Sequence, residues 1–376
     1  MRILIAPTAF KGTFSPAEVA KAMSEGVSEF ARVTGKDIFV DMLPIADGGD
    51  GTIEALALAT EGAVNQLTVS GSLGEPRQAL WLDMGTFAVV EMASACGIAG
   101  LPPDNLQPLL ANSLGLGTVI KHIIENTSIT QIVVAVGGSA STDGGSAAIF
   151  ELGARFFDQH DKLLIPAGGG SLIYIQRCDL SAARLKLREH ELSVLSDVNN
   201  PLLGEDGAAY IFAGQKGATP VEIIQLDDAL NHFADLVETD IDLRLRDIRG
   251  AGAAGGTAFG LAALGAKILP GFAWLADCLG LSERMRKADL VLTGEGRVDK
   301  SSLQGKAVGS LHELCLEFQK PLWSFSGSID KSIVVSESLP YMLLVELSKK
   351  GHADQSRIRE AVVETLCARF EAFENT

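Results

Sequence analysis

The sequence has few cysteines, and their arrangement points neither to a disulfide framework nor to a zinc site. The five cysteines stand at positions 96, 178, 278, 315 and 367, and no two of them form a C-x-x-C pair. The six histidines include no H-x-x-x-H pair. An odd number of widely spaced cysteines is typical of a protein from a reducing compartment. We therefore expect free thiols and no thiolate-bound metal.

Positive charge is also scarce. The chain has 31 lysines and arginines against 47 aspartates and glutamates, which gives a net charge of −16. Nucleic acids and anionic membranes are bound by basic surfaces, so neither is expected as a partner. A small anionic substrate is still compatible with this composition, because a local basic pocket can exist in an acidic protein.

Long hydrophobic runs are missing as well. The most apolar stretch, 259–281, is interrupted by Lys267, Pro270 and Asp277, so it predicts core helices and not a membrane span. The apolar residues before Pro7 are too few for the central region of a signal peptide. We expect a cytoplasmic protein.

The sequence does contain a regular alternation of short apolar runs and amphipathic segments. A capping box at Ser15–Glu18, with Pro16 at the first helical position, predicts the start of a helix. Apolar residues recur with helical spacing at 116–124. Helices are also predicted at 52–60, 305–318 and 355–373. Strands are predicted at 2–7, 38–46, 132–136, 289–294, 321–327 and 341–347. This alternation predicts an α/β fold with mostly parallel sheets.

At 376 residues the chain is long for one domain, and its middle has a different pattern. The segments 81–93 and 154–166 resemble hairpins, with Gly85 in the first turn. We predict a Rossmann-like parallel domain from residues 1–73 and 286–376, and an inserted mixed α/β domain from residues 74–285.

Glycine-rich loops recur along the chain and are the candidates for binding an anion. GGSASTDGG follows the strand 132–136, and similar loops occur at 46–52, 250–257 and 293–299. Glycines let the backbone approach an anion closely, and helix N-termini supply unpaired amides. A tight turn with an N-cap is the alternative for each loop alone. The residues predicted to bind a cofactor are Gly137, Gly138, Ser139, Asp143, Lys216, Gly252, Gly255, Gly256, Gly294 and Gly296.

Two common nucleotide-binding motifs do not fit. Gly250, Gly252 and Gly255 match G-x-G-x-x-G, but the preceding DLRLRDIR is not a buried strand. The sequence around Gly305 and Lys306 does not match the P-loop motif, and no protein-kinase motif is present. Any nucleotide must be held in another way.

Six segments carry a resemblance when they are taken in order. They are PTAFKGTFSPAEVAKA, LPIADGGDGTIEAL, VGGSASTDGG, SDVNNPLLGEDGAAYIFAGQKGA, GAGAAGGTAFGL and LVLTGEGRVDKSSLQGKAVG. Together they resemble the bacterial glycerate kinase family of the first type, over residues 1 to about 330. The resemblance implies ATP- and Mg²⁺-dependent phosphorylation of glycerate to 2-phosphoglycerate. It also implies two α/β domains with the active site in the cleft between them. The family usually has Pro-Asp-Ser-Phe-Lys where this chain has Pro7-Thr8-Ala9-Phe10-Lys11, and Thr8 cannot act as a carboxylate.

Phosphoryl transfer needs a carboxylate near the acceptor hydroxyl, oxygen ligands for Mg²⁺ and cationic groups around the phosphoryl. Asp197 is the predicted general base or metal ligand, with an Asx-turn as the alternative. Asp299 is a second predicted metal ligand, and Asp47 a further catalytic candidate; an N-cap is the alternative for both. Lys11 is assigned to phosphate and Arg297 to substrate carboxylate or phosphate, with a solvated surface cation as the alternative.

Other functions stay open from the sequence alone. One is phosphorylation at the 3-hydroxyl of glycerate, or of a related hydroxy acid. Another is a catalytically weakened regulatory protein that binds glycerate or a nucleotide, and a third is a nicotinamide dehydrogenase. A homodimer is also left open.

Overall fold

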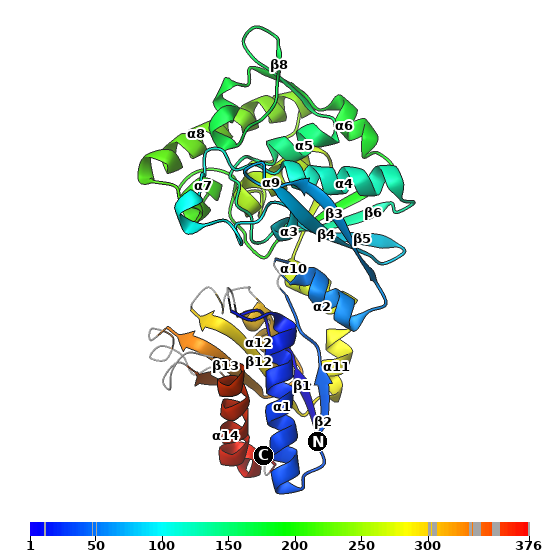
Figure 1. Cartoon of the computed structure of the whole chain (residues 1–376), viewed down its shortest axis with the longest axis vertical. Helices are drawn as coiled ribbons and strands as arrows, with labels where there is room; N and C mark the ends of the chain where they lie inside the picture. The colour runs from blue at the N-terminus through cyan, green and yellow to red at the C-terminus, as the bar shows by residue number, and fades with distance from the viewer. Residues whose placement is uncertain are drawn as a thin grey trace. The chain divides into compact units, whose positions relative to one another are not determined.

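Two large sheets, built from different parts of the chain, each belong to a compact unit of their own. The computed structural model describes residues 1–10, 13–46, 48–49, 51–299, 302, 307–330, 333, 340–347 and 354–374. The terminal unit comprises residues 1–47, 54–60 and 272–376, and the central unit comprises 48–53 and 61–271. The predicted fold class is confirmed: both chain ends form one parallel sheet, and the middle forms a separate mixed sheet (Figure 1).

The sheet of the terminal unit is parallel throughout, in the order β14-β13-β12-β1-β2. Its strands are β1 (Arg2–Ile5), β2 (Phe39–Met42), β12 (Leu290–Val298), β13 (Leu322–Ile329) and β14 (Met342–Glu346). The helices of this part of the chain are α1 (Pro16–Thr34), α2 (Thr52–Ala59), α10 (Gly271–Cys278), α11 (Leu281–Lys287), α12 (Ala307–Glu317) and α14 (Gln355–Glu374). All strands run in the same direction, but β2 is added on one side of β1 and β12, β13 and β14 on the other, so the strand order switches between β1 and β12. Ligands of open α/β sheets bind at such switch points.

Helices α1 and α14 lie side by side against this sheet, as Figure 1 shows. The predicted capping box is present, because Ser15 Oγ accepts from the Glu18 amide while the Glu18 carboxylate accepts from the Ser15 amide. The apolar face of α1 is buried against α14, where the rings of Phe30 and Phe370 are 4.9 Å apart. Gly26 permits this approach, since a Cβ there would stand 2.7 Å from the Arg359 carbonyl oxygen.

The central unit contains a six-stranded sheet in the order β11-β10-β6-β5-β4-β3, in which β5, β6, β10 and β11 are parallel. A small antiparallel sheet has the order β8-β7-β9. The strands are β3 (Ala63–Ser70), β4 (Pro76–Asp83), β5 (Phe87–Glu91), β6 (Gln131–Ala135), β7 (Arg155–Phe157), β8 (Leu163–Leu164), β9 (Arg177–Asp179), β10 (Glu191–Leu195) and β11 (Lys267–Leu269). Both predicted hairpins are present, as β4–β5 and β7–β8.

The helices of the central unit surround a single large apolar cluster. They are α3 (Met92–Cys96), α4 (Leu114–Asn126), α5 (Ser146–Leu152), α6 (Ser181–Lys186), α7 (Ala208–Phe212), α8 (Pro220–Ile241) and α9 (Ala253–Ala263), with 3₁₀ turns η1 (Pro103–Asn105), η2 (Gly169–Tyr174) and η3 (Gly214–Lys216). The predicted stripe at 116–124 lies on α4, where Leu116, Val119, Ile120 and Ile123 are buried. Such side chains each contribute roughly 1.5–3 kcal/mol to folding.

Three elements differ from the sequence predictions. The 293–299 segment is not a loop, because β12 continues through it and pairs with β13 as far as Val298. The apolar stretch 259–281 is not entirely helical, since β11 lies between α9 and α10 and pairs with β10. The chain passes between the units near residues 60 and 271, whereas the sequence placed the boundaries at 73 and 285, because β3 pairs with β4.

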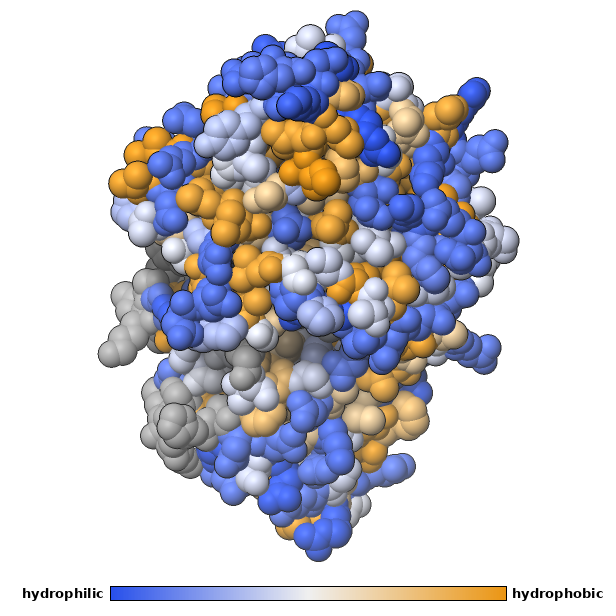
Figure 2. All heavy atoms as spheres, turned by 45° about the horizontal axis from the view of Figure 1, so that its top comes forward, coloured by the Kyte–Doolittle hydropathy of each residue, from blue (hydrophilic) through white to orange (hydrophobic). Residues whose placement is uncertain are grey.

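Apolar side chains on the surface are scattered. Figure 2 shows small groups of them between polar residues on the face that it presents. The exposed apolar residues include several near the small sheet, namely Leu163, Ile165, Ile173 and Tyr174. Exposed apolar residues of this kind are ordinary in globular proteins and do not by themselves mark a binding surface. No helix within the described ranges is long and apolar enough to cross a membrane.

Candidate active site

The carboxyl ends of three neighbouring parallel strands bring candidate residues together in the central unit. Strand β6 leads into Gly137, β10 into Asp197, and β5 ends at Glu91, which is opposite Ala135 in the sheet register. Because ligands of α/β sheets bind beyond the carboxyl ends of strands, this edge is the candidate site. Asp197 is half-buried there.

Gly48, Gly49 and the start of α2 contact this edge. The Gly137 amide donates to the Gly48 carbonyl over 3.3 Å, and a Cβ on Gly137 would stand only 2.4 Å from Gly49 Cα. Thr52 donates its amide to Glu91 Oε1 over 2.9 Å. Glu91 was missed from the sequence, although a glutamate that ends the apolar run FAVV is an available signal. It is only 7% exposed and holds the start of α2.

The open part of GGSASTDGG is its first two residues. Gly138 is exposed and has a φ of +73°, and its amide donates to no acceptor among the residues that the structure describes. Its carbonyl accepts from the Ile98 amide over 2.9 Å, which fixes the orientation of the peptide. A left-handed, exposed glycine whose amide donates to none of the described residues is a backbone donor that an anion can meet. We name Gly137, Gly138 and Ser139 the anion loop.

Asp143 has a structural task instead. It is fully buried, and its carboxylate accepts from the Ser113 amide and hydroxyl and from the Gly145 and Ala147 amides, at 2.7 to 3.5 Å. The Ala148 amide in turn donates to Ser113 Oγ. The amides at the start of α5 are therefore engaged by the protein itself. The start of α5 therefore has fewer amides to offer to an anion.

Lys216 lies under the anion loop rather than on the surface. Its side chain is 4% exposed, and Nζ donates to Ser139 Oγ over 2.9 Å and to the Ser141 carbonyl. Burial lowers the pKa of Lys216 to about 8, although Asp143 opposes this shift. The predicted cofactor residue thus contacts the loop and not its outer surface.

The glycines at 250–256 hold the back of the same loop. Ala254, Gly255 and Gly256 are all left-handed, which kinks α9 at its start. A Cβ on Gly255 would stand 2.2 Å from the Ser141 carbonyl oxygen, and the Gly255 carbonyl accepts from the Gly144 amide. Gly252 donates its amide to the Asn200 carbonyl, in the loop that contains Asp197. The glycine-rich segments at 137–145 and 250–256 therefore meet in the central unit, largely by packing on one another.

A second group of predicted residues lies in the terminal unit, along β12. Gly294 and Gly296 are strand residues, and Arg297 is exposed and forms an ion pair with Asp330 at 3.6 Å. Asp299 Oδ1 accepts from the Ser302 amide, so its side chain has a hydrogen bond to a nearby residue of the chain. Thr8 donates its amide and its hydroxyl to the Gly294 carbonyl, and thereby closes the end of β1 onto β12.

Two predicted catalytic residues, Lys11 and Asp47, lie outside the described residues. Within the described ranges, no group of three or more His, Cys, Asp or Glu side chains could hold a metal ion. The expectation of a site between the two domains stays a prediction.

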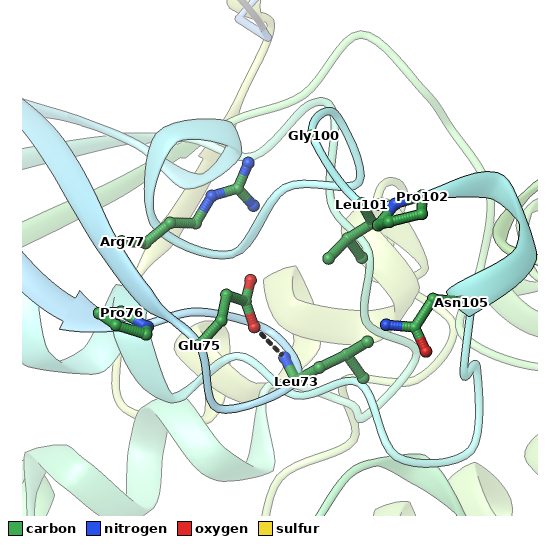
Figure 3. A pocket seen from close by; sticks show the side chains of 8 residues that line it. All are labelled: Leu73, Glu75, Pro76, Arg77, Gly100, Leu101, Pro102 and Asn105. Carbon is green, nitrogen blue, oxygen red and sulfur yellow. Dashed lines mark hydrogen bonds between the residues drawn. The ribbon is translucent and has the colours of Figure 1, made fainter.

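A pocket of about 410 Å³ lies between the β3–β4 turn and the segment 100–105 (Figure 3). Arg77 and Glu75 both point toward its centre, and Leu73 donates its amide to the Glu75 carboxylate. The Arg77 guanidinium donates to the Gly97 and Ala99 carbonyls. These carbonyls flank Ile98, whose amide holds Gly138, so Arg77 supports the anion loop from this pocket.

Comparison with known proteins now adds to this geometry. A model of the glycerate kinase family matches residues 3–361. The chain belongs to the glycerate kinase family. As a member, it is a kinase that acts on glycerate, and ATP is the phosphoryl donor that this implies.

Two curated relatives cover most of this family member. The glycerate 2-kinase of Escherichia coli K12 is 37% identical over 342 residues, which are 89% of this chain and 87% of the relative. The glycerate kinase of Haemophilus influenzae is 35% identical over 98% of this chain and 100% of its own length. A crystal structure from Salmonella typhimurium LT2, which carries a glycerate kinase 2 designation, is 33% identical and matches with a TM-score of 0.79 over 99% of both chains.

Proposed function

We propose that the protein transfers the γ-phosphoryl group of ATP to the 2-hydroxyl of D-glycerate and releases 2-phosphoglycerate. The observation that carries the choice of the 2-hydroxyl is the 37% identity to a relative named glycerate 2-kinase. The exposed amide of Gly138, beside Asp197 at the carboxyl ends of β6 and β10, is compatible with phosphoryl transfer at this edge.

Phosphoryl transfer depends mostly on positioning and on neutralising the charge of the phosphates. In the proposed mechanism, the anion loop holds an oxyanion of the substrates through backbone amides, and Asp197 accepts the proton of the acceptor hydroxyl. Arg297 is proposed to bind the carboxylate of glycerate or a phosphate, as a guanidinium does well. Lys11 and Asp47 keep their proposed roles at phosphate and in catalysis.

Mg²⁺ fits this donor set, because the ion is usually held by one or two carboxylates together with nucleotide phosphates and water. Asp197 is the carboxylate that we propose for it in the central unit, and Asp299 the one in the terminal unit. When bound, the ion would neutralise negative charge on the phosphates.

The test is a coupled assay with ATP, Mg²⁺ and D-glycerate, in which the product passes to enolase and no phosphoglycerate mutase is added. Enolase accepts only the 2-phosphate, so the proposal predicts formation of phosphoenolpyruvate at the same rate as ADP. A parallel reaction with the mutase added is the control. If phosphoenolpyruvate formed only when the mutase is present, the enzyme would be a glycerate 3-kinase. If ADP were released but no phosphoenolpyruvate formed in either reaction, the phosphoryl group would go to another acceptor.

A further inference from the structure

Lys216 is a buried cation placed directly behind the anion loop. It comes from η3, the short turn between α7 and α8, and its Nζ donates to Ser139 Oγ and to the Ser141 carbonyl. Both acceptors belong to the stretch that continues from Gly138. The loop is therefore exposed at Gly138 and bonded to a lysine ammonium at the next residue.

Two titratable groups face this lysine from the elements around it. Asp143 approaches from the loop before α5, and Cys96 from the end of α3. Burial raises the pKa of the Cys96 thiol to about 12, so the thiol is neutral at physiological pH. Asp143 is a carboxylate whose acceptor positions are taken up by Ser113, Gly145 and Ala147. Lys216 therefore directs its own hydrogen bonds to the loop and not to a carboxylate.

We propose that Lys216 is a positioning residue for the oxyanion bound at Gly137–Ser139. It holds Ser139 and Ser141 in place, and its charge attracts the anion through the loop without touching it. The role rests on the proposed function, and the oxyanion is either a phosphate of the nucleotide or the carboxylate of glycerate. A charge in the protein interior, where the dielectric constant is low, attracts an anion at a given distance more strongly than a charge in solvent does.

The charge of Lys216 makes the anion loop sensitive to pH. Because burial lowers the pKa of Lys216 to about 8, the lysine loses its proton as the pH rises through this value. Anion affinity should then fall. Folding stability should change in the opposite direction: the unfolded lysine, with its pKa near 10.5, binds more protons than the folded one between about pH 8 and 10.5, so stability rises over this range.

The experiment measures binding of ADP and of D-glycerate, separately, by titration calorimetry between about pH 7.5 and 9.5. For the wild type we expect the affinity of one ligand to fall about tenfold over this range, and that ligand identifies the anion. Lys216→Met should bind this ligand about tenfold more weakly at pH 7.5 and show no further loss. Lys216→Arg should retain affinity at pH 9.5, because arginine stays charged.

The control variant is Lys121→Met. Lys121 belongs to the same unit but lies on the surface of α4, where it forms an ion pair with Glu151 at 2.9 Å. It should keep the pH profile of the wild type. The proposal would be overturned if, for each ligand, the wild type had the same affinity at pH 7.5 and at pH 9.5. This result would count even if Lys216→Met fails to fold. Binding does not depend on which product is released, so a failed enolase assay would be a separate result.

Discussion

Asp143 and Asp197 follow neighbouring strands of one sheet, yet their side chains have different surroundings. Asp143 is fully buried and accepts from four protein donors, so its charge is used to hold the starts of α4 and α5. Asp197 is half-buried at the end of β10. A fully buried carboxylate that is enclosed by donors cannot exchange a proton with a substrate, whereas a half-buried one at a strand end can.

The matched substitutions Asp143→Asn and Asp197→Asn should therefore separate stability from catalysis. Asp143→Asn removes the charge opposite Lys216 and should lower the free energy of unfolding by about 2–4 kcal/mol. Asp197→Asn should lower kcat by about 100-fold or more, with a stability change within about 1 kcal/mol. Urea denaturation and steady-state kinetics measure the two effects. Full kcat in Asp197→Asn would remove this residue from the mechanism.

The positions of the glycine-rich loops could be predicted from the sequence, but the roles of individual residues within them could not. Asp143 looks like a ligand-binding aspartate because Gly-Gly follows it, and its main partner, Ser113, lies 30 residues earlier in the chain. Lys216 stands in the polar sequence AGQKGA, which gives no sign that the side chain is buried. Burial and distant partners arise only when the chain folds.

Strands and helices were easier to predict, because their signal is local. The capping box of α1 and the apolar stripe of α4 depend on residues that are adjacent on one helix. The glycines of β12 misled the prediction: TGEG resembles a loop, but pairing with β13 keeps it extended. Strand β11 was missed because it is three residues long inside an apolar stretch.

The kinked start of α9 is the element whose geometry depends most on glycine. Gly255→Ala should lower the free energy of unfolding by about 3–5 kcal/mol, because the new Cβ adds left-handed strain and would stand 2.2 Å from the Ser141 carbonyl oxygen. Gly265→Ala is the control at the end of the same helix. Its φ is also positive, at +101°, but nothing lies within 4 Å, so only about 1–2 kcal/mol is expected. Equal losses in guanidinium denaturation would show that packing against Ser141 has no effect.

The central unit is inserted in the sequence between the strands of the terminal sheet: β1 and β2 precede it, and β12, β13 and β14 follow it. Strand β1 lies between β2 and β12, so the C-terminal strands lack a neighbour without the first residues of the chain. The resemblance to known sequences supplied the function, whereas the unit boundaries depended on which sheet β3 joins. Pairing between distant strands is not encoded in any local pattern.

Separate fragments should behave accordingly. The fragment 48–271 retains the whole six-stranded sheet and should unfold cooperatively in urea, as followed by circular dichroism. The fragment 272–376 lacks β1 and β2 and should show no cooperative transition. A sharp transition in the second fragment would mean that β12, β13 and β14 form a stable sheet without β1.

The position of β1 also determines the order of events during translation. Strand β1 and α1 leave the ribosome before the central unit, but Ile3 pairs with Leu290, and the apolar face of α1 packs on α14, which is synthesised after the central unit. The central unit can therefore complete its folding while the nascent N-terminal segment still has no partner. During that interval the apolar face of α1 is exposed to solvent, so it is a segment that a chaperone can bind until synthesis is finished.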